Sequence, residues 1–246
     1  MTSTHTLTIS LLTVVLSLPA LAHDGRRFEV QINSEGQLIA QGVNTGADDG
    51  APAIRPYLNA IHGHWINFPS LGGAAANLPG FDLFNPTEAL EGASLTLTLD
   101  NAFRWTAPPP MPPADATPVF EPLDASESII ISYGGSAGST LSTDSFGGSL
   151  TLLDAVPVGG QGDLDLGYEI GLIPDDTIYI LQFTLGTDAP GITDSDPVYA
   201  IMLPQGPSLH HAGLFTERYL GTPVPEPGSL AVLAVAAAAS GTRRRR

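Results

Sequence analysis

The sequence contains no cysteine and no lysine among its 246 residues. Without cysteine, the chain cannot form disulfides, thiolate metal sites, iron–sulfur clusters or a thiol nucleophile. Its nine basic residues are all arginine, and they stand against 25 acidic residues. A surface with this excess of negative charge repels nucleic acids and attracts divalent cations. We therefore exclude DNA and RNA as partners.

Helical patterns are also scarce, whereas glycine (27 residues) and proline (22 residues) are abundant. Between them lie short segments in which apolar and polar residues alternate, and this period of two is typical of strands. Residues 177–185 are apolar on both faces, which is typical of a central strand. The pattern predicts an all-β antiparallel sandwich, for which a jelly roll is one arrangement. The expected strands are residues 27–33, 37–43, 94–100, 128–133, 149–153, 166–172, 177–185 and 198–203.

One or two short helices are expected, at residues 53–65 and at residues 208–220. The proline-rich residues 107–122 (APPPMPPADATPVFEP) predict an extended loop without regular structure. This segment could link two domains. The length of the chain favours a single domain with one long loop, and 43% apolar residues suffice for its core.

The first 22 residues have the pattern of a cleavable signal peptide. Residues 7–18 form an apolar run, and Ala20 and Ala22 supply the small side chains that signal peptidase requires before its cleavage site. A short buried helix is the alternative, but polar sequence begins abruptly at His23. Cleavage would therefore leave His23 as the first residue of the exported protein.

The last 22 residues combine three features: the tripeptide Pro225, Glu226, Pro227, then a short apolar stretch, then a cluster of arginines. This order resembles the PEP-CTERM sorting signal of exported bacterial proteins. The resemblance implies recognition by an exosortase-type enzyme and a place in the cell envelope or in an extracellular polysaccharide matrix. The arginines of the cluster are Arg243, Arg244, Arg245 and Arg246.

The apolar stretch at residues 228–242 would form a helix about 22 Å long at ~1.5 Å per residue, against a bilayer core of ~30 Å. Arginines behind it would stay on the cytoplasmic side. We expect a short transmembrane helix that anchors the protein at least for a time, rather than an alanine-rich soluble helix. The predicted segments are a signal peptide (1–22), an acidic β-rich extracellular domain (23–224) and a sorting tail (225–246).

Histidine supplies the first candidate for a binding site. If their segment is extended, His62 and His64 point to the same side, because alternate residues of a strand share a face. His210 and His211 could join them if the two ends of the domain meet. Neutral imidazole is a good ligand for zinc or copper. The alternative is that all four are ordinary polar residues of loops.

Acidic loops supply the second candidate, because closely spaced carboxylates can bind calcium. None of them has the spacing of an EF-hand, and solvated turns between strands are the alternative interpretation. The aspartates concerned are Asp48 with Asp49, Asp163 with Asp165, Asp175 with Asp176, and Asp188 with Asp194 and Asp196.

Catalysis has little support in the sequence. Residues 134–138 match the G-x-S-x-G pattern of serine hydrolases, but that motif requires a following helix, and loop-like sequence follows here. We expect a surface or matrix protein that is structural or binding and not an enzyme, with a metal-binding surface protein as the alternative. Its expected partners are signal peptidase, the sorting enzyme, the membrane through the tail, and extracellular polysaccharide.

Overall fold

The computed structural model describes residues 26–44, 58–84, 88–134 and 139–221 of the chain. These residues form fifteen strands, one α-helix and one short 3-10 helix, η1 (Glu88–Leu90). The all-β prediction is therefore confirmed for the described part of the chain. The expected signal peptide with its cleavage site at His23, and the expected apolar helix of the tail, lie outside the described residues.

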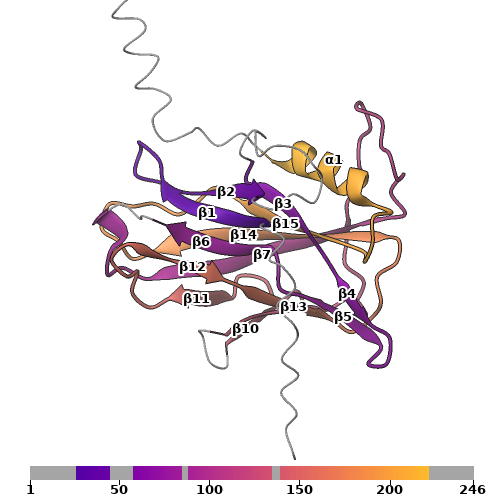
Figure 1. Ribbon diagram of the computed structural model, residues 1–246, viewed down its shortest axis with the longest axis horizontal. Helices are drawn as coiled ribbons and strands as arrows, with labels where there is room; N and C mark the ends of the chain where they lie inside the picture. Colours follow the sequence, from indigo (N-terminus) through magenta and orange to yellow (C-terminus); the bar gives the residue numbers. More distant parts are fainter. Residues whose placement is uncertain (1–25, 45–57, 85–87, 135–138, 222–246) are drawn as a thin grey trace, which may run out of the picture.

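The largest sheet has six strands and includes β3, which carries His62 and His64 (Figure 1). Its order is β11-β7-β14-β15-β3, and β8 pairs with β7 off this path. The edge strand β3 runs parallel to β15, with His62 beside Ile201 and His64 beside Leu203. The strands are β3 (Ala60–His64), β7 (Leu95–Thr106), β8 (Glu121–Pro122), β11 (Ser149–Leu153), β14 (Thr177–Thr187) and β15 (Val198–Leu203).

Two smaller sheets complete the domain, in the orders β12-β6-β1-β2 and β10-β9-β13-β5-β4. The pairing of β1 with β6 is parallel, as is that of β15 with β3, so the fold is mixed and not purely antiparallel as expected. The strands are β1 (Arg26–Ile32), β2 (Leu38–Asn44), β4 (Ile66–Phe68), β5 (Gly73–Ala76), β6 (Gly80–Phe84), β9 (Ile129–Tyr133), β10 (Thr140–Ser142), β12 (Gly160–Leu164) and β13 (Leu166–Ile170).

The central strand β14 is buried on both faces, as its sequence predicts. Tyr179 and Leu181 enter the large core, to which all three sheets contribute apolar side chains. Ile178 and Ile180 point to the opposite face and join a second, smaller core. Both faces of the six-stranded sheet are therefore covered. The face that carries Ile178 and Ile180 is covered by an element other than a second sheet.

That cover is the helix α1 (His210–Leu220), which packs on β15 and β3 (Figure 1). Ala212 is fully buried in the smaller core, and Leu209, just before the helix, is also buried there. Gly213 allows close approach, since a Cβ at this position would lie 2.6 Å from Cδ1 of Leu203. The helix expected at residues 208–220 is thus confirmed. The helix expected at residues 53–65 is wrong in its described part, which contains β3.

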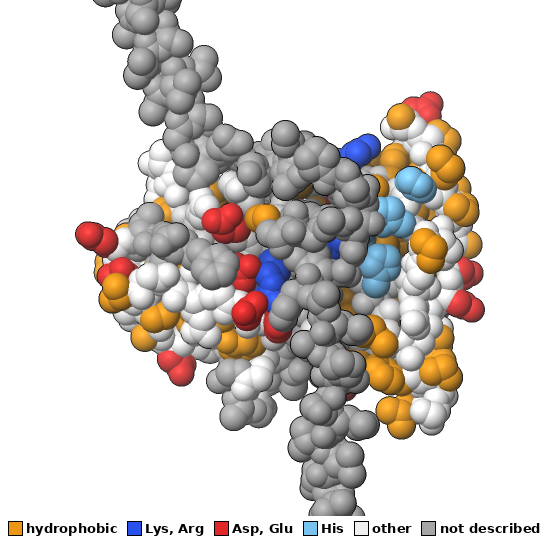
Figure 2. All heavy atoms as spheres, in the orientation of Figure 1, with side chains coloured by type: hydrophobic (Ala, Val, Ile, Leu, Met, Phe, Trp, Pro, Cys, Tyr) orange, Lys and Arg blue, Asp and Glu red, His pale blue; other side chains and the backbone are white. Residues whose placement is uncertain are grey.

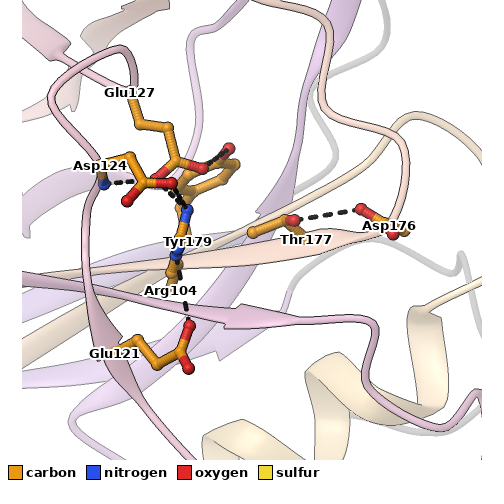
Figure 3. Close-up of polar contacts among 7 residues, drawn as sticks. All are labelled: Arg104, Glu121, Asp124, Glu127, Asp176, Thr177 and Tyr179. Carbon is orange, nitrogen blue, oxygen red and sulfur yellow. Dashed lines mark hydrogen bonds and ion pairs between the residues drawn. The ribbon is translucent and has the colours of Figure 1, made fainter.

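The proline-rich segment has no regular structure over residues 107–120, as expected, whereas its last two residues form β8. Arg104, near the end of β7, contacts acidic side chains at the end of the proline-rich segment and just after it (Figure 3). Its Nη1 donates to Glu127 at 2.8 Å and to Asp124, and its Nε lies 3.6 Å from Glu121. The hydroxyl of Tyr179 donates to Glu127 at 3.0 Å. Burial, together with the charge of Glu127, raises the pKa of Tyr179, so its phenol stays protonated and keeps donating to Glu127.

Candidate metal centre

Strand β3 places two histidines on the side of the sheet that α1 covers. Ala60 belongs to the smaller core and Ile61 to the large one, so the alternation continues with His62 and His64 on the side of Ala60. Gly63 between them faces the opposite way, where a Cβ would lie 2.4 Å from the carbonyl oxygen of Leu78. Only glycine therefore fits between the two histidines.

Helix α1 adds a third imidazole at its first residue, His210. One ligand nitrogen each from His62, His64 and His210 lies within 4.8 Å of the others. The ring centroids are 5.1 Å apart for His62 and His210, 5.6 Å for His62 and His64, and 6.4 Å for His64 and His210. Nitrogens that bind one tetrahedral zinc at ~2.0–2.1 Å are about 3.4 Å apart. The limit of 4.8 Å exceeds that separation, so the side chains would rotate for one ion to contact all three nitrogens.

His62 is the most constrained of the three, with 1% of its surface exposed. Its Nδ1 lies 2.5 Å from Oε1 of Glu217, and the same oxygen accepts a hydrogen bond from the His62 backbone N–H at 2.8 Å. A carboxylate at Nδ1 favours the tautomer with its proton there. The other ring nitrogen, Nε2, is buried and has no hydrogen-bond partner. Its lone pair is therefore available for a metal ion.

The charge state of His62 also favours the binding of a metal ion. Burial lowers its pKa to about 4, although the hydrogen bond and the charge of Glu217 oppose the shift. The positive charge of Arg26 and the proximity of His64 lower the pKa further. His62 is therefore neutral at physiological pH, and the neutral form is the one that binds metals.

His64 and His210 lie at the mouth of the site. Both are partly exposed, and Nδ1 of His64 lies 3.3 Å from the carbonyl oxygen of Pro204. Figure 2 shows pale blue histidine side chains gathered on the surface, on the side where Figure 1 places α1. Three protein ligands with an open side leave a fourth position for water or an external ligand.

His211 does not belong to this group. It is exposed, and its ring centroid lies 5.9 Å from that of His210. Successive residues of a helix are turned by about 100° from each other, so adjacent histidines cannot both face β3. Of the four histidines singled out in the sequence, the structure brings three together.

Five of the seven candidate aspartates that the structure describes form ion pairs or accept hydrogen bonds within the protein. Asp82, Asp163 and Asp165 surround the buried guanidinium of Arg27, at 3.5, 3.1 and 2.7 Å. Arg27 thus occupies the place that a cation would take among these carboxylates. Elsewhere, Asp176 accepts a hydrogen bond from Thr177, Asp188 from Ser94 and Asp196 from Gln37. Asp48 and Asp49 lie outside the described part of the chain. Residues 135–138, which belong to the G-x-S-x-G pattern, also lie outside it.

Two residues next to the histidines had not been identified from the sequence. One is Glu217, and the other is Arg26, whose Nη1 donates to the His62 carbonyl oxygen at 3.4 Å. Glu217 follows His210 by seven residues, which is two helical turns, so the sequence did hold a signal that both lie on one face of α1. No local pattern connects Arg26 to His62.

Among the described residues, no helix is both long and apolar enough to cross a bilayer. The membrane span expected at residues 228–242 lies outside these residues.

The comparisons with known proteins concern the C-terminus. Residues 223–246 match the model of the PEP-CTERM protein-sorting motif. No curated protein and no solved structure matches the chain. The match confirms the interpretation of the tail made from the tripeptide, the apolar stretch and the arginines. The chain carries a PEP-CTERM protein-sorting motif, and it is thereby an exported protein addressed to an exosortase-type sorting system at the cell envelope.

Proposed function

We propose that the β domain binds a transition-metal ion, zinc or copper, through His62, His64 and His210, and that the sorting motif delivers this site to the cell surface. The observation that carries the proposal is Nε2 of His62. This nitrogen is buried without a hydrogen-bond partner, while Glu217 holds the opposite nitrogen of the ring. A buried polar atom without a partner is costly, and a metal ion would satisfy it.

The ligand set determines which ions are expected. Three imidazoles are typical ligands of zinc and copper, whereas calcium and magnesium prefer oxygen ligands. Copper(II) binds nitrogen sites more tightly than zinc does, so availability outside the cell would decide between the two. The domain carries 24 acidic residues against five arginines once Glu226 and the four terminal arginines are set aside. That charge favours the approach of any divalent cation.

The proposed role is binding and not catalysis. The carboxylate nearest to the histidines, Glu217, already accepts two hydrogen bonds from His62. Glu217 therefore orients His62, a proposed metal ligand, and is not available as a general base for a substrate. The protein would capture or display a metal ion at the cell envelope.

Isothermal titration calorimetry of the purified full chain with zinc tests the proposal. We expect one zinc ion per chain. Replacing His210 by alanine removes a ligand and should weaken binding by more than about 100-fold, the upper range for changes in outer-shell partners. The matched control is His211→Ala, which changes the neighbouring histidine outside the group and should leave the affinity unchanged.

Glu217→Gln provides a second arm of the same experiment. Glutamine keeps an oxygen that can accept the two hydrogen bonds from His62 but removes the negative charge. We expect zinc affinity to fall by about 10- to 100-fold while the fold is retained. Weak, salt-sensitive binding that is equal in all variants would contradict the proposal, because it would indicate general attraction of cations to the acidic surface.

A further inference from the structure

The four residues of the proposed site come from two elements that are far apart in the sequence. His62 and His64 lie on the edge strand β3, whereas His210 and Glu217 lie on α1. An ion held by all three histidines would connect the edge of the six-stranded sheet to the last described helix. The site is complete only when α1 lies against β3.

Helix α1 has few means of stability of its own. It has 11 residues, and isolated helices of that length are marginal in water. Its N-cap residue is Leu209, which makes no side-chain capping hydrogen bond, and no acidic residue lies in the first turn. The helix therefore depends on its docking, through Ala212 and neighbouring apolar residues, on the smaller core.

The metal would bind at the first turn of the helix, which has no side-chain cap. His210 is the first residue of α1, while the Glu217 contact to His62 lies two turns later. Glu217 joins α1 to His62 by hydrogen bonds, and the His210 ring lies against the rings of His62 and His64. An ion would add coordination bonds between this uncapped end of the helix and β3.

We infer that metal binding and the docking of α1 are one coupled equilibrium, so that metal occupancy sets how firmly α1 is held. This inference rests on the proposed function. A ligand that binds only the docked state stabilises that state, and the coupling is reciprocal. The sorting motif matches from residue 223, three residues beyond Leu220, so α1 is the last described element before it. The metal would then stabilise the last described helix of the domain, which precedes the sorting motif in the sequence.

Hydrogen–deuterium exchange of the full chain, with and without zinc, tests the coupling. At a free zinc concentration 100 times its dissociation constant, exchange of amides in residues 210–220 should slow by up to about 100-fold. Peptides from β9 and β13, in a different sheet, should exchange equally in both samples. His211→Ala should behave as the wild type does.

The decisive variant is His64→Ala, because it removes a ligand from β3 and leaves every residue of α1 unchanged. It should lose both zinc binding and the protection of α1 by zinc, so that its exchange is the same with and without zinc. If zinc binds one-to-one by calorimetry and α1 exchanges at the same rate, the coupling is refuted and the metal site stands. If no zinc binds at all, the proposed function itself fails.

Discussion

At the scale of single residues, the burial of His62 has a consequence for stability that does not require a metal. Its pKa is lowered to about 4 in the folded protein, against ~6.5 for an unperturbed imidazole. Between these values the unfolded chain binds a proton here that the folded chain does not. The charged and titratable groups around His62 are Glu217, Arg26, His64 and His210.

We therefore expect the metal-free protein to lose stability as pH falls from about 6.5 to about 4. The contribution of His62 is complete above pH 6.5, and its full loss corresponds to about 3 kcal/mol at ~1.4 kcal/mol per unit. Urea unfolding in the presence of a chelator measures it. The control is His62→Asn, whose stability should fall less steeply over the same range. Equal slopes for the two proteins would contradict the prediction.

At the scale of elements, strand β3 depends on a residue that has no side chain. The carbonyl oxygen of Leu78 would lie 2.4 Å from a Cβ at position 63, and its carbonyl carbon 2.9 Å. Both are backbone atoms, so the strand and not a side chain would have to move. His62 and His64 flank this position and would move with the strand.

Gly63→Ala should therefore lower the free energy of unfolding by about 1–3 kcal/mol, the usual cost of overpacking. It should also weaken zinc binding, although no ligand is changed. Urea unfolding and calorimetry measure the two effects. Gly171→Ala is the matched control, because a Cβ there meets nothing within 4 Å, and its stability should change by less than about 0.5 kcal/mol. A stable Gly63→Ala protein with normal zinc affinity would show that the contact is unimportant.

Elements also show how far the sequence could predict the structure. Strands with strict alternation were located well, and β11 (Ser149–Leu153) and β15 (Val198–Leu203) have the predicted bounds. Strand β3 was mistaken for part of a helix, because its pairing partner β15 lies about 140 residues away and leaves no trace in the local pattern. The candidate site likewise depends on contacts between segments that are far apart in the sequence.

His62 and His64 share a face because strand periodicity is a local property, whereas His210 joins them because α1 docks on β3. The contact between His62 and Glu217 spans 155 residues and could not be predicted from either segment alone. The same holds for Arg27, whose pairing with Asp163 and Asp165 turns a predicted calcium candidate into an internal ion-pair network. Tertiary docking determined both outcomes.

At the scale of the whole molecule, the sorting tail determines the location of the protein. Truncation before Pro225 should move the protein from the envelope fraction to the soluble fraction, because it removes the apolar stretch at residues 228–242. Fractionation and immunoblotting measure the shift. Replacing Pro225, Glu226 and Pro227 by alanine is the control, since it keeps the apolar stretch and should keep the protein with membranes. A truncated protein that still sediments with membranes would place the anchor elsewhere.

The edge of the six-stranded sheet has one further consequence, for contacts between copies of the protein. An open edge strand offers unpaired backbone groups to the sheets of neighbouring molecules, which invites aggregation. On β3, the N–H of His62 donates to Glu217 and its carbonyl oxygen accepts from Arg26. The residues that frame the proposed metal site thus also block strand-to-strand association between copies of the domain.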